Sequence, residues 1–196
     1  MQMPLVYRFL FPGMWLSWVI YWLWAARRAK PSERREATGS RLLHVIPLSL
    51  AVWLLWGRGV PVPFLNDRLF PWAPWEFWIA AFITALGLLF TVCARVYLGP
   101  NWSGVVTIKQ GHELIDDGPY ALVRHPIYTG LLAAFIGSAV AVGEWRGVLA
   151  VLMAGAAFWR KVRVEERWMT ERFGERYLAY RKRVPALVPL WKWMRT

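Results

Sequence analysis

The sequence lacks most of the features on which soluble secreted and redox proteins depend. It has a single cysteine, Cys93, which excludes an intramolecular disulfide framework and a cysteine-based zinc site. Charged residues make up only 18% of the 196 residues, and the 12 acidic residues are outnumbered by 24 basic ones. The chain also has no G-x-G-x-x-G motif, so it gives no indication of a Rossmann dinucleotide site.

Apolar and aromatic residues, by contrast, are abundant. Hydrophobic residues account for 57% of the chain, which includes 15 tryptophans. The charged residues are gathered between apolar runs, as in an integral membrane protein. The net charge of +12 could indicate nucleic acid, but Lys and Arg that flank apolar segments meet anionic lipid headgroups instead. We therefore expect membrane lipids, and no nucleic acid, among the partners.

Five apolar segments are candidates for membrane helices: 9–26, 42–56, 75–98, 127–142 and 145–159. Pro47 is expected to kink the second segment. Gly143 and Glu144 join the last two in a tight turn, which predicts a helical hairpin whose short arms tilt or cross only in part. The expected fold is an all-α polytopic membrane protein with about five transmembrane helices in one domain, residues 1–196.

The distribution of Lys and Arg predicts the orientation in the membrane. The connection 27–41 has six of these residues and the tail 160–196 has eleven, against two in 57–76 and one in 143–146. With five crossings, the basic connections fall on one side, which the positive-inside rule makes cytoplasmic. The N-terminus is then expected outside, without a cleavable signal peptide, because no small-residue cleavage site precedes the first basic cluster.

Two polar stretches lie on the predicted cytoplasmic side. The first, GHELIDDGPYALVRHPIYTG at 111–130, holds two His, one Arg and three acidic residues between strongly apolar segments. The second, at 160–184, carries the adjacent acids Glu165 and Glu166. Its apolar residues recur at helical spacing, which predicts a cytoplasmic amphipathic C-terminal helix that is broken at Gly174. We interpret the two stretches as halves of one site.

The first stretch also has a purely structural interpretation. His125 followed by Pro126 can simply start a membrane helix, because the missing N–H of proline needs no partner in a first turn. Arg124 would then meet lipid headgroups. Tyr120 and Tyr128, however, add polar-tipped side chains near the same membrane surface, which favours a site over a turn alone.

The adjacent acids in the second stretch likewise have two interpretations. Helix-surface ion pairs with Lys161, Arg163 or Arg167 would each contribute less than about 1 kcal/mol. Two carboxylates are unfavourable near the C-terminal end of a helix dipole, however, so ion pairing explains the basic residues better than the acidic ones. A carboxylate held in this position is suited to binding a cationic group such as an ammonium.

Together the stretches resemble the isoprenylcysteine carboxyl methyltransferase and phospholipid methyltransferase superfamily of integral membrane enzymes. The resemblance covers about 101–189 and rests on H-x-L-[VI]-x-x-G-x-Y-x-x-[VI]-R-H-P-x-Y, followed by E-E and F-G-x-x-Y-x-x-Y. It implies methyl transfer from S-adenosylmethionine to a lipophilic acceptor that enters from the bilayer: a prenylcysteine-like carboxylate, a thiol or a phospholipid amine. Residues 99–196 would form the cofactor-binding half and 1–98 three N-terminal spans.

The resemblance also implies roles for particular residues. The cofactor would be contacted by members of both stretches: His112, Leu114, Ile115, Tyr120, His125, Pro126, Tyr128 and Glu165. The family's arginine that orients the acceptor carboxylate is replaced here by Lys161, a point charge that cannot form a bidentate fork. Arg160 or Arg163 could substitute for it, although from a different helix face.

The need for a general base depends on the acceptor. A thiol or protonated amine must lose a proton, and His125 and Glu166 are the candidate bases. A carboxylate acceptor requires no base. No metal site is predicted.

Two other functions fit parts of the pattern. Sterol reductases share an R-H-P-x-Y element and use NADPH, but the E-E pair stands where a dinucleotide phosphate would need cations. A non-enzymatic lipid-binding membrane scaffold could also hold a polar loop at the interface. The composition, rich in Arg and Trp, further predicts a bacterial inner-membrane protein with its site and C-terminus in the cytoplasm.

Overall fold

The computed structural model describes residues 5–27, 32–57, 60–71, 73–99, 102, 107–109 and 114–189. Within these ranges the chain is mainly helical. The elements in chain order are α1 (Leu5–Ala26), β1 (Ser32–Arg35), α2 (Thr38–Trp56), the 3₁₀ turn η1 (Pro63–Asn66), α3 (Pro74–Leu98), β2 (Thr107–Lys109), α4 (Pro119–Leu122), α5 (Pro126–Val142), α6 (Trp145–Phe173) and α7 (Glu175–Arg183).

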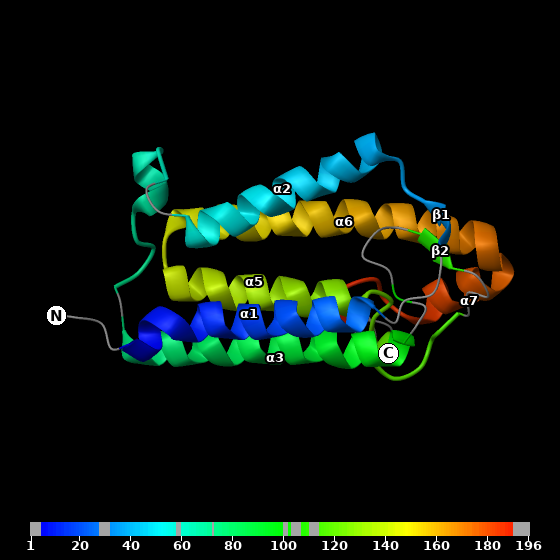
Figure 1. Ribbon diagram of the computed structural model, residues 1–196, viewed down its shortest axis with the longest axis horizontal. Helices are drawn as coiled ribbons and strands as arrows, with labels where there is room; N and C mark the ends of the chain where they lie inside the picture. The colour runs from blue at the N-terminus through cyan, green and yellow to red at the C-terminus, as the bar shows by residue number, and fades with distance from the viewer. Residues whose placement is uncertain are drawn as a thin grey trace.

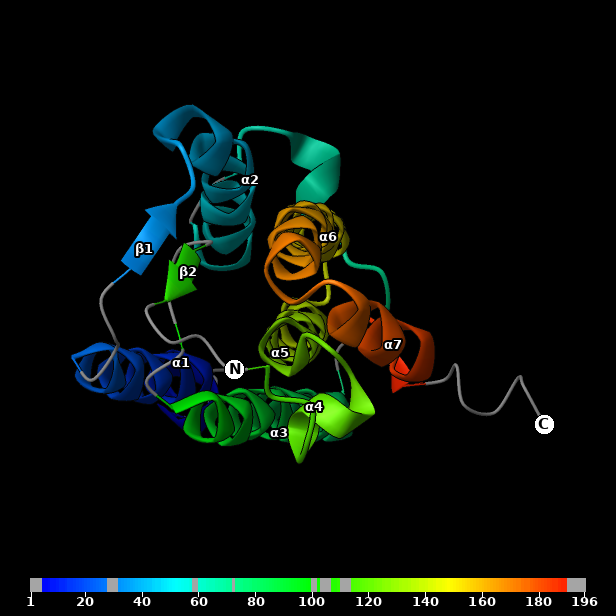
Figure 2. The same ribbon diagram turned by 90° about the vertical axis from the view of Figure 1, so that its right-hand side faces the viewer.

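The five long helices form an open bundle (Figure 1). Viewed along its axis, they follow one another in the order α2, α6, α5, α3, α1, and each packs against the next (Figure 2). This order leaves α1 and α2 on the same side of the bundle, at the left of Figure 2, with α5 and α6 to their right. The main apolar core lies where α2, α5 and α6 meet, around Ala51, Phe135, Ala154 and Phe158.

Among the residues that the structure describes, three helices are long and apolar enough to cross a membrane: Phe9–Ala26 within α1, Thr38–Trp56 and Pro74–Leu98. Helix α5 is apolar but shorter, at 17 residues. The predicted segments 9–26, 42–56, 75–98 and 127–142 each lie inside one of these helices. The chain is thus an integral membrane protein of all-α type, and the number of five crossings stays a prediction.

Helices α3 and α5 approach each other unusually closely because both carry glycine at the crossing. A Cβ atom added to Gly87 would lie 2.5 Å from the carbonyl oxygen of Gly130, and one added to Gly130 would lie 2.5 Å from that of Gly87. Neither position can accept a side chain without separating the backbones, since these distances are well inside van der Waals contact. The glycines therefore fix the position of α5 relative to α3.

Helix α6 differs from the prediction in one respect. A span at 145–159 and a separate tail helix were expected, but one continuous helix of 29 residues runs from Trp145 to Phe173. The predicted break at Gly174 is confirmed: its φ of 53° ends α6, and α7 follows at once. Gly143, with φ of 66°, makes the predicted tight turn between α5 and α6.

The all-α prediction missed a small antiparallel ribbon, in which β1 pairs with β2. The two strands come from connections more than 70 residues apart and have only four and three residues, too few to show an alternating pattern. The ribbon, α4 and α7 all lie at one end of the bundle (Figures 1 and 2). That end also carries the described residues of both polar stretches.

Candidate functional site

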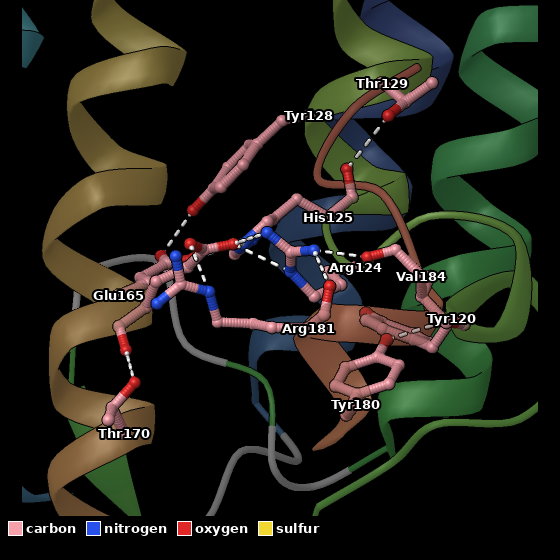
Figure 3. Close-up of polar contacts among 11 residues, drawn as sticks. Tyr120, Arg124, His125, Tyr128, Thr129, Glu165, Thr170, Tyr180, Arg181 and Val184 are labelled. Atoms are coloured by element: carbon pink, nitrogen blue, oxygen red, sulfur yellow. Dashed lines mark hydrogen bonds and ion pairs between the residues drawn. The ribbon is translucent and has the colours of Figure 1, made fainter. Parts of the chain in front are cut away.

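The two predicted halves of the site meet in the structure. The Tyr128 hydroxyl donates a hydrogen bond to Glu165 Oε1 at 2.5 Å. Nδ1 of His125 lies 3.4 Å from Glu165 Oε2. Figure 3 shows His125 and Tyr128 reaching from the start of α5 toward the carboxylates on α6. The polar stretch before α5 and the acids near the end of α6 therefore form one constellation.

Local backbone geometry aims the first stretch at α6. Gly118, with φ of 52°, lies so close to the Tyr97 ring that any side chain there would collide with it. After the single turn of α4, His125 occupies the N-cap of α5 and Pro126 its first helical position. His125 and Tyr128 are three residues apart, so their rings lie on one helix face, stacked 5.7 Å apart.

Glu166 is held by cations rather than facing a ligand. Arg124 donates to its Oε1 from Nη2 and, at 2.8 Å, from Nε. Nε2 of His125 lies 3.4 Å from the same oxygen, and Arg181 Nε lies 3.5 Å from Oε2. Burial alone would raise the pKa of Glu166, but hydrogen bonds from His125 and Arg124 outweigh it and lower the pKa to about 2.

Arg124 corrects one interpretation of the sequence. The purely structural interpretation of the first stretch placed it among lipid headgroups, but only 9% of its side chain is exposed, and it pairs with Glu166. It also donates to the carbonyl oxygen of Val184. These partners lie 42 and 60 residues further along the chain, so no local spacing could have indicated them.

Residues 184–187, here called the C-terminal strap, hold the turn that carries His125. The backbone N–H groups of Arg124 and His125 donate to the carbonyls of Pro185 and Ala186 at 2.8 and 3.0 Å. Thr129 Oγ1 donates to the Leu187 carbonyl at 2.7 Å. Since the backbone donors at the start of α5 have no partners within the helix, the strap satisfies groups that would otherwise be unpaired.

The two adjacent acids consequently have different environments. Glu165 contacts His125 and Tyr128 and faces a cavity, whereas Glu166 lies behind it in the ion cluster. Burial alone would raise the pKa of Glu165, but the hydrogen bond from His125 and the charge of Lys161 lower it. Burial alone would lower the pKa of His125, but its bonds to both carboxylates raise it. The cluster therefore favours an imidazolium between two carboxylates.

The cavity beside Glu165, here called the polar cavity, has a volume of about 290 Å³. Eight of the residues that the sequence assigned to the site line it: Leu114, Ile115, Tyr120, His125, Pro126, Tyr128, Lys161 and Glu165. Arg163 is exposed and lies over the Trp159 ring, 6.0 Å from its centre, away from the cavity. His112 lies outside the described residues.

Other lining residues were missed by sequence reasoning. Among them are five from α1, α2 and the region after α3: Trp18, Trp22, Arg41, His44 and Trp102. Arg160, considered as a substitute for Lys161, instead forms a cluster with Glu36, Ser40 and His44 at the side of α2. A histidine inside an apolar segment was the available signal, since ionisable residues in membrane helices are usually functional.

A second, almost entirely apolar cavity adjoins the first. This apolar groove has a volume of about 430 Å³ and lies among α1, α2, α5 and α6. Four of its side chains also line the polar cavity: Trp18, Leu48, Leu131 and Phe158. The two cavities are therefore neighbours separated by a shared wall. In the described part of the chain, no group of three or more His, Cys, Asp or Glu side chains is placed to hold a metal ion.

Comparison with known proteins gives related sequences. A protein-S-isoprenylcysteine O-methyltransferase of Schizosaccharomyces pombe is 34% identical over 108 residues, which cover 54% of this chain and 46% of that protein. An Arabidopsis thaliana protein-S-isoprenylcysteine O-methyltransferase is 28% identical over 126 residues, 61% of this chain and 64% of that protein. A cobalt-zinc-cadmium resistance protein of Cupriavidus metallidurans is 31% identical over 144 residues, 71% of this chain and 63% of that protein.

The chain spans between about half and two thirds of the length of these relatives. The family model described as phospholipid methyltransferase matches residues 75–176, more than half of the chain. These matches favour neither a sterol-type reductase nor a non-enzymatic scaffold. The matched region includes α3, α5, α6 and the carboxylate constellation. The chain therefore belongs to the phospholipid methyltransferase family, within the superfamily that the two motifs indicated.

Proposed function

We propose that the protein is an S-adenosylmethionine-dependent methyltransferase whose lipophilic acceptor enters from the bilayer. The observation that carries this proposal is the position of Glu165, an ionised carboxylate that faces a polar cavity with an apolar groove beside it. A cationic, water-soluble methyl donor suits the first space. An apolar acceptor suits the second.

The residues of the polar cavity fit such a donor. The carboxylate of Glu165 would pair with its ammonium, since the lowered pKa keeps the group ionised at neutral pH. The aromatic residues Tyr120, Tyr128 and Trp18 belong to the lining, while Leu114 and Ile115 supply apolar contact. When bound, S-adenosylmethionine supplies an electrophilic methyl group on a sulfonium. Most of the rate enhancement would then come from alignment and exclusion of water.

The ion cluster argues against a strong general base. Both ring nitrogens of His125 face carboxylates, so the imidazole holds its proton more tightly than usual. Glu166, with a pKa of about 2, binds protons too weakly to serve as an efficient base at neutral pH. This geometry favours an acceptor that is already ionised. We therefore propose a prenylcysteine-like carboxylate as the acceptor class, ahead of a thiol or a phospholipid amine.

The orientation and location follow from the charge distribution. We propose five crossings, with the N-terminus outside and the polar cavity and C-terminus in the cytoplasm of a bacterial inner membrane. The six basic residues of 27–41 and the eleven of 160–196 support this orientation. The donor would enter the polar cavity from the cytoplasm, and the acceptor would enter the apolar groove laterally between α1 and α2.

The direct test is calorimetric titration of the detergent-purified protein with S-adenosylhomocysteine. We expect wild type to bind and Glu165→Gln to bind about tenfold to a hundredfold more weakly, because a charge-assisted hydrogen bond contributes about 1.5–3 kcal/mol. Glu175→Gln, which changes an exposed carboxylate at the start of α7, is the matched control and should bind like wild type.

Thermal unfolding should first show that wild type and Glu165→Gln are both folded. Equal affinity of the two proteins for S-adenosylhomocysteine would then contradict the assigned cofactor contact. Methyl transfer from labelled S-adenosylmethionine should then be compared for three acceptors: N-acetyl-S-farnesylcysteine, an alkyl thiol and a phospholipid amine. Preference for the thiol or the amine would overturn the proposed carboxylate class while leaving methyl transfer itself intact.

A further inference from the structure

His44 lies outside both sequence motifs, yet it is buried in the wall of the polar cavity. Only 4% of the residue is exposed. It comes from α2, and its neighbours Arg41 and Val45 line the same cavity. A buried imidazole in the apolar segment 42–56 requires a polar partner, since an unpaired polar group in such a place is costly.

One ring nitrogen of His44 has such a partner. Arg160 Nη1 lies 2.9 Å from Nδ1 of His44. Because a guanidinium can only donate hydrogen bonds, Nδ1 must accept this one and cannot carry a proton. The neutral ring then carries its proton on Nε2. Arg160 is itself held by Ser40 at 2.6 Å and by Glu36 at 3.2 Å, so the donor that sets this tautomer is fixed in place.

The second ring nitrogen is left for a ligand. Among the described residues, the polar contacts of the His44 ring are all made by Nδ1: Arg160 at 2.9 Å and Glu36 at 3.8 Å. Arg160 already has two other acceptors, so His44 is not needed to satisfy it. In the described part of the chain, a single N–H donor therefore remains on a residue that lines the cavity.

Two cationic side chains share this part of the cavity. Lys161, on α6, and Arg41, one turn before His44 on α2, both belong to the lining. Lys161 Nζ lies 5.2 Å from the centre of the Tyr128 ring, and Tyr128 in turn bonds Glu165. The cavity therefore combines one ionised acid that can receive a cationic group with a donor-rich side that can receive an anionic one.

We propose that His44 Nε2–H binds a carboxylate group of a ligand, on the side of the polar cavity that Lys161 and Arg41 also line. Arg160 is a positioning residue that acts through the His44 tautomer. This inference rests on the proposed function, because it concerns the same cavity. The carboxylate can come from the amino-acid part of the methyl donor or from the acceptor, and both present the same charge and geometry.

The experiment compares ligands with and without a carboxylate. The detergent-purified full chain is titrated with S-adenosylhomocysteine and with its decarboxylated analogue, in wild type, His44→Phe, His44→Gln and Arg160→Met. The KM for N-acetyl-S-farnesylcysteine is measured on the same four proteins. Phe keeps the ring volume without a donor, whereas Gln keeps an N–H donor at similar reach.

If the carboxylate is that of the donor, His44→Phe and Arg160→Met should weaken binding of S-adenosylhomocysteine about tenfold. They should leave binding of the decarboxylated analogue within about twofold, and His44→Gln should restore most of the loss. If the carboxylate is that of the acceptor, the same pattern should appear in the KM, with both titrations unchanged. A purely structural role would weaken every ligand alike.

Equal losses for both titrated ligands, or no change in either the titrations or the KM, would overturn this inference while leaving the proposed function intact. Failure of folded wild type to bind S-adenosylhomocysteine at all would overturn the proposed function, and this inference with it. The two failures are therefore distinguishable in one set of measurements.

Discussion

The polar cavity and the apolar groove share four helices, α1, α2, α5 and α6, which change character over about two turns. On α2, His44 lines the polar cavity, Val52 lines the groove, and Leu48 lines both. On α5, the corresponding side chains are Tyr128, Phe135 and Leu131. On these shared helices, the depth of a residue along the helix decides which cavity it lines. A reaction between a polar donor and an apolar acceptor can therefore be located at the level of the shared side chains.

The substitution expected to have the largest effect removes the cation of Arg124, the closest partner of Glu166. Arg124→Met leaves Glu166 as a buried charge without its closest partner, so we expect a loss of about 3 kcal/mol in the free energy of unfolding. Thermal unfolding in detergent should show a lower Tm, together with weaker binding of S-adenosylhomocysteine, because the turn that carries His125 loses its support.

Arg183→Met is the matched control for this change. Its ion pair with Asp116 is mostly exposed, so its removal should alter stability by less than about 1 kcal/mol. Adding Glu166→Gln to Arg124→Met should recover part of the lost stability, because the unpaired charge disappears. A Tm that is equally low in the double variant would show that Arg124 acts mainly through the C-terminal strap.

Low pH should reduce the stability that the ion cluster around Glu166 contributes. The pKa of Glu166 is about 2, below its ordinary value of 4.5, so the stability it contributes is present above pH 4.5 and lost as the pH falls toward 2. The loss amounts to about 3 kcal/mol, since each unit of pKa difference corresponds to about 1.4 kcal/mol. His125 has a raised pKa, so its contribution is complete below about pH 6.5 and is lost as the pH rises through the raised value.

The measurement is Tm against pH for wild type and Glu166→Gln. The difference between the two proteins should be nearly constant around pH 5–6 and shrink in acid, because only wild type has the Glu166 carboxylate to protonate. If the two curves remain parallel down to pH 3, the pairing of Glu166 does not stabilise the fold.

The substitution with the smallest expected effect changes the apolar groove alone. Val52→Trp adds a large ring to a side chain that lines the groove but not the polar cavity. We expect the KM for N-acetyl-S-farnesylcysteine to rise about tenfold. The added ring would fill part of the groove and weaken the binding of an apolar chain by about 1–3 kcal/mol. Binding of S-adenosylhomocysteine should not change.

Ile46→Trp controls for the added tryptophan, because Ile46 lies on the same helix, is 60% exposed and lines neither cavity. It should leave both quantities unchanged. If Val52→Trp weakens S-adenosylhomocysteine as much as it raises the KM, the two cavities do not act separately.

Local signals in the sequence predicted most of the fold. Apolar length gave the long helices, and Gly143 and Gly174 marked turns that the structure confirms with positive φ. The continuity of α6 through 159–160 was missed, because a change from apolar to charged residues indicates a change of environment and not the end of a helix. Hydropathy and backbone conformation are separate properties.

The site was predictable where a motif carried it and hidden where long-range contacts did. The acids and the His-Pro turn could be assigned to a site from the sequence, because polar residues at a membrane surface require a structural or functional reason. Arg124, by contrast, depends on Val184 and Glu166, and the His44–Arg160 contact joins residues 116 positions apart. No spacing rule relates such pairs, because the bundle, rather than the local sequence, brings them together.

The unbroken length of α6 has a consequence for the membrane in which the protein works. From Trp145 to Glu165 the helix rises about 30 Å, which equals the thickness of the hydrocarbon layer. In the proposed five-span arrangement, the length of this helix places the Glu165 carboxylate at the boundary between hydrocarbon and water. A thicker bilayer would place that carboxylate inside the hydrocarbon layer, and a thinner one would place it in the aqueous layer. The chain length of the lipids would therefore affect the proposed reaction.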